Sequence, residues 1–206
     1  PERLSVVVLD RHFDAIPLSL RIDRGVNVTD TDQYCCGNFW AYLIDGGIVL
    51  PENLLFIGVA DYPRQQSDPI SEKFRESYLT FEERGCSFFP LWKFDGCYID
   101  SLTQFIYDTI TTSYVYVSLD LDVGAYRCTH AARYMDGPGI NRQNLLDIAG
   151  IIANGGRNGS FMLVGFDIME FNMHFLGIKT AEAVEDSTLP LVIDFIKTLM
   201  EASPTS

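Results

Sequence analysis

One short stretch near the start of the chain, residues 4–15, limits what the rest can fold into. A run of apolar and mostly β-branched residues, Leu4–Leu9, ends abruptly in Asp10, His12 and Asp14. That composition is typical of a β-strand buried on both faces. Side chains two residues apart point the same way in an extended chain, so the three polar groups are expected to converge. Two carboxylates and an imidazole directed at one point outline a metal site.

The rest of the chain alternates between apolar runs and segments with helical patterning. Further strands are predicted at Leu54–Ala60, Cys86–Leu91, Tyr114–Leu119 and Phe161–Phe166, and helices at about 37–46, 70–84, 100–112, 141–154 and 180–201. This alternation predicts a three-layer α/β/α sandwich with a mostly parallel sheet. The 206 residues contain no repeat and no linker, so we expect a single domain over residues 1–206.

Carboxylates follow two more of the predicted strands. Asp120 and Asp122 come directly after Tyr114–Leu119, and Asp167 and Glu170 come after Phe161–Phe166. In open parallel sheets, ligands bind beyond the carboxyl ends of the strands, so all these groups are expected to share one site. The alternative interpretation is that each acid separately forms a turn or caps a helix.

The predicted site has a definite chemical character. Its candidate metal ligands are Asp10, His12, Asp14, Asp120 and Asp122. Four carboxylates and one imidazole suit Mn²⁺ or Mg²⁺ better than zinc or copper, which favour more His or Cys. So many like charges without a cation would raise one another's pKa values and destabilise the fold. Two ions held about 3.5–4 Å apart by bridging carboxylates would acidify a water between them, which predicts hydrolysis.

Glu170 is predicted to have a different role from the ligands. A carboxylate beside such a nucleophile can bind a cationic group such as guanidinium through paired hydrogen bonds. Asp167 is expected to orient the ligands by hydrogen bonding. The alternative for Glu170 is a solvated loop acid or a helix cap, and the residues alone favour neither interpretation.

The charge and the cysteines exclude several functional classes. A net charge of −13 argues against nucleic acid and anionic membranes as partners, because both require clustered Lys and Arg. The cysteine count of five is odd, and the C-x-x-C spacing of zinc knuckles does not occur. We therefore expect a cytoplasmic location. The adjacent Cys35 and Cys36 are predicted to be small, partly buried filler, and His130 and His174 are predicted to lie outside the site.

Three motifs in order resemble the signatures of the ureohydrolases, the family of arginase, agmatinase and formimidoylglutamase. They are D-R-H-F-D at 10–14, S-L-D-L-D at 118–122 and G-F-D-I-M-E-F-N at 165–172. In addition, C-G-N-F-W at 36–40 resembles the substrate loop of the family. D-G-P-G-I-N-R-Q-N-L at 136–145 resembles the stretch that leads into the helix after the second signature. The resemblance therefore spans nearly the whole chain.

The resemblance implies an activity and roles for single residues. It implies two Mn²⁺ ions on the five candidate ligands and a hydroxide between them. That hydroxide would cleave a guanidino or amidino C–N bond of a small cationic substrate and release urea, as in an agmatinase or arginase. Glu170 would bind the guanidinium, Asp14 would pass a proton to the leaving amine, and Asn38 would lie in the substrate loop. Trimers or hexamers are expected, because family members tend to form them.

Three departures from the family pattern leave alternatives open. The family has a further metal-binding His in a glycine-rich motif upstream of D-x-H-x-D, and nothing here corresponds to it. We therefore expect the C-terminal two-thirds of a longer chain, lacking the first strands of the sheet. Cys36 stands where arginases and agmatinases have a His, and Gly124–Tyr126 replaces an Asp-Pro. The alternatives are formimidoylglutamase-type hydrolysis in the same scaffold and a non-catalytic structural or regulatory subunit.

Overall fold

The protein is built around a sheet whose strands are all parallel. The computed structural model describes residues 3–15, 36–63, 69–96, 98–177 and 186–201. The strands are β1 (Leu4–Leu9), β2 (Leu54–Ile57), β3 (Ser87–Phe89), β4 (Tyr114–Asp120) and β5 (Met162–Met169). Their order in the sheet is β3-β2-β1-β4-β5, so β1 and β4 lie side by side at its centre.

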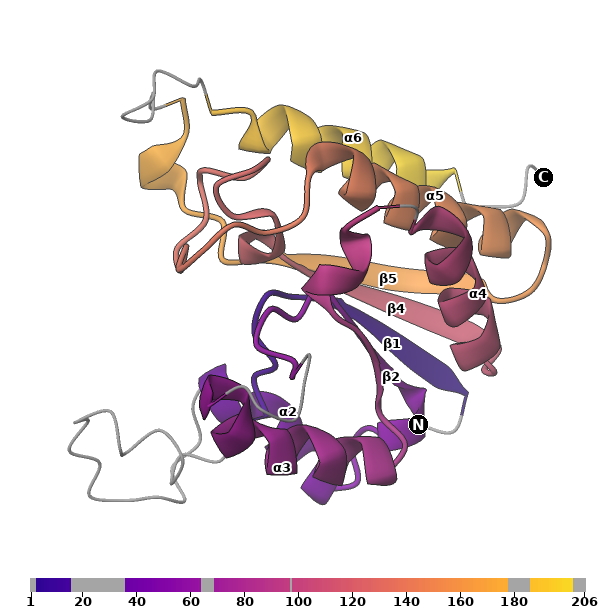
Figure 1. Cartoon of the computed structure of the whole chain (residues 1–206). Coiled ribbons are helices and arrows are strands. Elements are labelled where there is room, and N and C mark those ends of the chain that lie inside the picture. Colours follow the sequence, from indigo (N-terminus) through magenta and orange to yellow (C-terminus); the bar gives the residue numbers. More distant parts are fainter. Residues whose placement is uncertain (1–2, 16–35, 64–68, 97, 178–185, 202–206) are drawn as a thin grey trace.

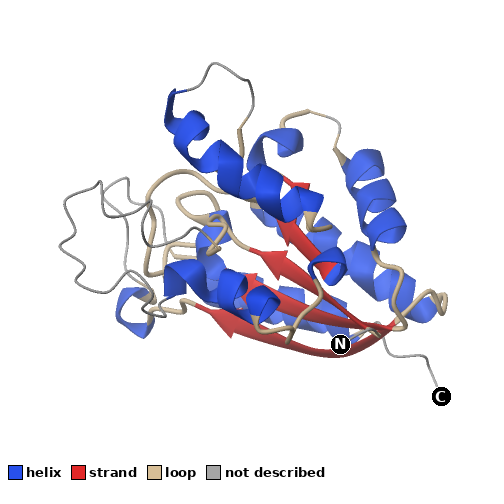
Figure 2. Cartoon of the chain, turned by 90° about the horizontal axis from the view of Figure 1, so that it is seen from below, coloured by secondary structure: helices blue, strands red, loops and turns tan. Residues whose placement is uncertain are grey.

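Helices cover both faces of this sheet (Figures 1 and 2). They are α2 (Phe39–Asp45), α3 (Pro69–Glu83), α4 (Ile99–Thr109), α5 (Arg142–Arg157) and α6 (Thr188–Met200). Figure 1 shows α4, α5 and α6 above the sheet and α2 and α3 below it. The predicted three-layer α/β/α sandwich with a parallel sheet is confirmed. Residues 180–185, the first part of the helix predicted at 180–201, lie outside the described residues.

Each face of the sheet has its own hydrophobic core. On β1, Val7 and Leu9 belong to the core under α4, α5 and α6, whereas Val6 and Val8 belong to the core shared with α2 and α3. All four side chains are buried, as the composition of the strand predicts. The double burial fixes β1 firmly, and with it the residues that follow Leu9.

The last strand is not buried in this way, contrary to the prediction. Met162, Val164 and Met169 of β5 are 55%, 52% and 52% exposed, although Leu163 and Phe166 pack against the first core. β5 is the edge strand of the described sheet, and the core that α2 and α3 share with the sheet involves mainly β1, β2 and β3. The apolar run therefore predicted the strand correctly, but the prediction that both of its faces are buried is wrong.

The ends of β2 and β5 each differ from the prediction by three residues, for local reasons. β2 stops at Ile57 because Gly58 has φ +99°, and a Cβ there would lie 2.4 Å from Cγ2 of Val123. β5 continues to Met169, so Asp167 lies within the strand and pairs in register with Ser118. No helix within the described part of the chain has the length and apolar character needed to cross a bilayer.

Candidate metal centre

The residues after β1 form a turn rather than a continued strand. The strand ends at Leu9, and the backbone N–H of His12 donates to Oδ1 of Asp10 at 2.6 Å. Phe13 is buried in the second core, and Asp14 has φ +48°. The predicted convergence through extended geometry is therefore wrong. Asp10 and His12 approach each other because the turn folds one back on the other.

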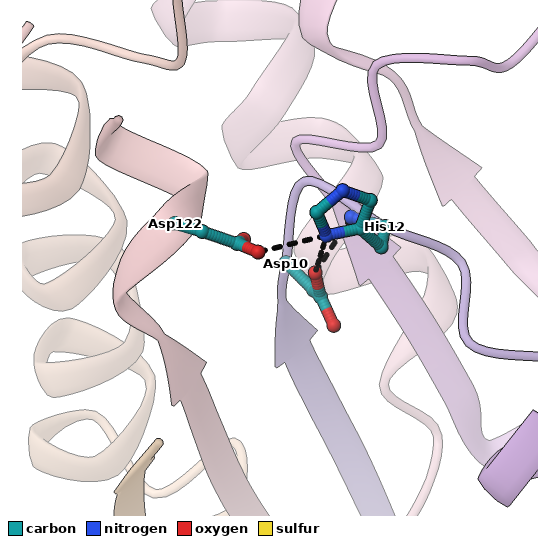
Figure 3. Close-up of side chains that lie close together, drawn as sticks. All are labelled: Asp10, His12 and Asp122. Atoms are coloured by element: carbon teal, nitrogen blue, oxygen red, sulfur yellow. Dashed lines mark hydrogen bonds and ion pairs between the residues drawn. The ribbon is translucent and has the colours of Figure 1, made fainter. Parts of the chain in front are cut away.

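This turn meets a second one at the end of β4 (Figure 3). A ligand atom from each of Asp10, His12 and Asp122 lies within 4.8 Å of the others. Nδ1 of His12 is 2.7 Å from Oδ2 of Asp122 and 3.8 Å from Oδ1 of Asp10. The backbone N–H of Asp122 donates to Oδ1 of Asp120 at 2.9 Å. The structure thus brings together three of the five predicted ligands in one compact group.

Neighbouring residues fix this group from behind. The backbone N–H of Arg11 donates to Oδ1 of Asp122 at 3.2 Å. The side chain of Arg11 donates to Oδ1 of Asp136 at 2.6 Å, and Nε2 of His12 donates to Oδ2 of the same carboxylate at 3.1 Å. Neither Arg11 nor Asp136 was predicted as a site residue. The stretch 136–145 that contains Asp136 was noted only for its resemblance to the family, and nothing in the sequence singled out Arg11.

The electrostatics of the group call for a cation. Burial raises the pKa of Asp10 well above its usual range, and the charges of Asp122, Asp120 and Asp14 add to the effect. Burial, together with the charges of Asp122 and Glu170, raises the pKa of Asp120 to about 8. Burial would lower the pKa of His12, but hydrogen bonds to Asp122 and Asp136 outweigh it and raise the pKa to about 9.

These side chains therefore fit a divalent ion. Buried carboxylates that can ionise only at a free-energy cost are stabilised by a nearby positive charge. The donor set of carboxylate oxygens and one imidazole nitrogen suits Mn²⁺ or Mg²⁺.

The remaining predicted carboxylates line a cavity of about 380 Å³ beside the group. The carboxylates that line it are those of Asp10, Asp14, Asp120, Asp167 and Glu170, and its apolar lining includes Val8, Phe39, Trp40 and Met169. Asp14 and Asp120 thus lie at the cavity and outside the three-residue group, and their role as ligands stays a prediction. The cavity offers an acidic wall and an apolar wall to one small molecule.

Glu170 and Asp167 come to the cavity from β5. Asp167 accepts hydrogen bonds from Oγ of Ser118 at 2.8 Å and from the hydroxyl of Tyr116 at 3.1 Å, so its carboxylate is held against β4. Glu170 follows the strand with φ +58°. Glu170 also lines a second cavity with Arg133 and His174.

Comparison with protein-family models decides the family. The model described as "Arginase family" matches residues 1–189. The chain belongs to the arginase family. No curated protein matches it by sequence comparison.

Solved structures show the same fold as this arginase-family chain. Formimidoylglutamase from Bacillus subtilis matches with a TM-score of 0.69 and 15% identity, over 98% of this chain and 55% of that one. Proclavaminate amidino hydrolase from Streptomyces clavuligerus matches with a TM-score of 0.65 and 20% identity, over 97% and 56%. Arginase from Bacillus subtilis gives 0.67 and 16%, over 97% and 64%. The chain thus spans 55–64% of the length of these three structures.

Asn38 and Cys36, two residues of the predicted substrate loop, differ in their burial and in their position relative to the cavity. Asn38 is buried at the start of α2 and is not among the described residues that line the cavity. Cys36 lines the cavity and is exposed, so the prediction of a partly buried filler is wrong for it. Cys35 lies outside the described residues. The thiol of Cys36 therefore borders the space where a substrate would lie.

Three further polar residues complete the surroundings. Asp61, missed in the sequence, follows β2 and accepts a hydrogen bond from the hydroxyl of Tyr78. Burial raises its pKa, although the bond from Tyr78 lowers it. Asp61 directly follows the predicted strand Leu54–Ala60, so its position is as visible in the sequence as those of the other strand-end acids. The backbone N–H of His130 donates to Oγ1 of Thr188, and His174 is exposed, so neither joins the three-residue group.

Proposed function

We propose that this chain carries the metal site of a hydrolase that cleaves a guanidino or amidino C–N bond of a small cationic substrate. The observation that supports this most is the close approach of Asp10, His12 and Asp122 beside an acid-lined cavity. Membership of the arginase family adds support. The similar structures include an arginase, a formimidoylglutamase and an amidino hydrolase, whose names all refer to amidine chemistry.

Asp10, His12 and Asp122 would hold the metal, with Asp14 and Asp120 as further ligands, and we propose two Mn²⁺ ions. When bound, the ions would supply acidified water as the nucleophile for cleavage of the C–N bond. The chain's own contribution is to keep the ligands fixed before the metal binds. The hydrogen bonds of His12 to Asp10 and of Arg11 to Asp122 do this at the two turns.

The cavity suits a cationic substrate. Glu170 would bind the guanidinium or amidinium through paired hydrogen bonds, in which both the donor and the acceptor are charged. Asp167 stays fixed against Ser118 and would keep this wall of the cavity acidic. Asp14, at the cavity and beside the cluster, would pass a proton to the leaving amine. An agmatinase-like or arginase-like substrate is proposed.

The test is product release from a panel of candidate substrates. The metal-loaded protein would be assayed with agmatine, arginine and guanidinobutyrate for urea, and with formimidoylglutamate for formamide. We expect manganese-dependent turnover of at least one guanidino compound and none after chelation. Asp122→Asn is the matched control for background activity. The absence of turnover on every substrate would contradict the proposal.

A second candidate is a non-catalytic relative that keeps the fold. The exposed Cys36 at the cavity, in place of the histidine of arginases and agmatinases, favours it, because imidazole is the usual proton carrier near neutral pH and is absent from this position. The same residue is compatible with formimidoylglutamase-type hydrolysis. Counting bound ions separates the main alternatives: two per chain favours the enzyme, and one or none favours the non-catalytic subunit.

A further inference from the structure

Arg11 joins the turn after β1 to a distant loop. Its side chain is only 12% exposed and donates to two acceptors, Oδ1 of Asp136 and the carbonyl of Pro138, both at 2.6 Å. A guanidinium presents its donors in a rigid fork, so two acceptors fix its orientation. The loop at 136–138 is therefore held in place by the residue between Asp10 and His12.

Asp136 uses its second carboxylate oxygen on the imidazole. Nε2 of His12 donates to Oδ2 of Asp136 at 3.1 Å, while Nδ1 lies 2.7 Å from Asp122. The ring is thus held from both edges, with Nε2 toward the loop and Nδ1 toward the carboxylate cluster. A carboxylate behind a metal-binding imidazole fixes the ring's orientation and increases its basicity as a ligand.

The loop is shaped for this contact. A Cβ on Gly137 would lie 2.5 Å from Nη2 of Arg11, so only glycine lets the guanidinium come this close. The N–H of Gly139 donates to the carbonyl of Ala125 at 2.8 Å, and the N–H of Ile140 donates to that of Val123 at 2.7 Å. Through these bonds the loop is tied to the same turn that carries Asp122.

We propose that Arg11, Asp136, Gly137 and Pro138 form a clamp that aims Nδ1 of His12 at the ion. We call these four residues the Arg11–Asp136 clamp. The proposal rests on the metal site of the proposed function. Asp136 is a positioning residue here, because it acts on the ion only through His12. The loop that contains it was singled out in the sequence only for its resemblance to the family.

The size of the effect follows from the exposure of Asp136. Loss of a carboxylate behind a metal-binding histidine weakens metal binding by about 10- to 100-fold. The side chain of Asp136 is 63% exposed, so water can replace part of what it supplies. We therefore expect Asp136→Ala to weaken Mn²⁺ binding by about 10-fold, at the lower end of that range.

Calorimetric titration of the full chain with MnCl₂ provides the first test. Asp136→Ala is compared with Arg11→Lys, which keeps the charge but not the fork and should weaken binding less. Asp45→Asn is the matched control. Asp45 is 66% exposed and pairs with Arg84 at 2.8 Å, and Asp136 is 63% exposed and pairs with Arg11 at 2.6 Å. The side chain of Arg11 is 12% exposed. We expect Asp45→Asn to bind Mn²⁺ like the wild type.

Nitrogen-15 NMR of the Zn²⁺-loaded protein reads the contact itself. The chain has only three histidines, so the ring signals of His12 can be assigned with single variants. We expect its Nε2–H to be protected from exchange in the wild type and in Asp45→Asn, and to exchange with water in Asp136→Ala. A purely structural role for Asp136 would leave this signal unchanged in a folded variant.

The outcomes separate the two proposals. Wild-type affinity in a folded Asp136→Ala variant, or an unprotected Nε2–H in the wild type, overturns the clamp and leaves the metal site standing. A wild-type chain that binds no Mn²⁺ overturns the metal site and the clamp together. If Asp136→Ala does not fold, Asp136→Asn, which keeps one acceptor, replaces it and should show a smaller loss in the same direction.

Discussion

The two sides of the candidate site are held in different ways. On the metal side, Asp10 and Asp122 are 5% and 2% exposed, and backbone N–H groups of the turn after β1 donate hydrogen bonds to both carboxylates. On the cavity side, Asp14 and Glu170 stand on left-handed backbone with φ +48° and +58°, and Glu170 follows an edge strand with one exposed face. The metal side is fixed by backbone hydrogen bonds from a turn that follows a buried strand. The cavity side depends on turns at the border of the fold.

This difference predicts that substitutions on the two sides have separable effects. Changes on the metal side should alter ion binding and, through it, all activity. A change of Glu170, which is a cavity-side residue and not a proposed ligand, should alter the use of substrate at nearly constant metal content.

The largest effect is expected from Asp122→Asn. The substitution removes a buried charge that faces both His12 and the cluster, and the isosteric amide keeps the shape. We expect Mn²⁺ affinity to fall by at least about 100-fold, the upper end of what even indirect partners of a ligand cost. Calorimetric titration measures it, with Glu170→Gln as the control expected to stay within about threefold, since Glu170 lies outside the three-residue group. Equal losses in both variants would remove the distinction between the two sides.

Glu170→Gln should instead reduce catalysis. Hydrogen bonds to charged groups contribute about 1.5–3 kcal/mol, so kcat/KM should fall by roughly 10- to 150-fold. Steady-state kinetics on the guanidino substrate that is turned over provides the measurement, with bound manganese determined on the same samples. Unchanged kcat/KM would show that Glu170 does not contact the substrate's cationic group.

The metal side should also set the pH dependence of stability. The pKa values of Asp10 and Asp120 are raised in the fold, so the stability that each contributes is lost as the pH rises. For Asp120, whose pKa is about 8, the contribution is complete below about pH 4 and is lost as the pH rises to about 8. The pKa of His12 is raised to about 9, so its contribution is also lost as the pH rises. The melting temperature of the metal-free protein should therefore fall from pH 5.5 to pH 8.5.

Thermal unfolding with and without MnCl₂ measures whether the melting temperature falls or rises with pH. The ion binds the deprotonated carboxylates, so its stabilising effect should be larger at pH 8.5 than at pH 5.5. Asp10→Asn should flatten the metal-free profile, and Glu170→Gln should flatten it less, because Glu170 is only one of several causes that raise the pKa of Asp120. A metal-free melting temperature that rises over this range would contradict the described charge distribution.

The smallest effect is expected from Ser118→Ala. It removes the hydrogen bond of 2.8 Å to Asp167, while the bond from Tyr116 at 3.1 Å remains. The free energy of unfolding should fall by about 1 kcal/mol, with Mn²⁺ affinity unchanged. Urea denaturation of the variant and of the wild type measures the difference. A loss of metal binding in this variant would show that the metal side and the cavity side are not independent.

The fold could be predicted well because its signals are local. The apolar runs of β1 and β4 and the helical segments between strands identify the architecture from neighbouring residues alone. The exposed face of β5 could not be predicted in this way, because exposure depends on which helices pack beneath a strand. The length of the chain does not indicate which helices pack beneath a strand either.

The site could be predicted only in part, for the same reason. Acids at strand ends pointed to Asp10 and Asp122, and the same rule applied to β2 would have added Asp61. The left-handed turn at Asp14 is not visible in the sequence. Arg11 and Asp136 are 125 residues apart, so no local pattern joins them.

We propose that the turns after β1 and β4 together hold a divalent ion. Diffraction from crystals soaked in MnCl₂, recorded at the manganese absorption edge, locates such an ion. We predict an anomalous peak within bonding distance of Asp10, of Nδ1 of His12 and of Asp122. A soaked crystal with no peak between these three side chains would show that the two turns do not form a metal site.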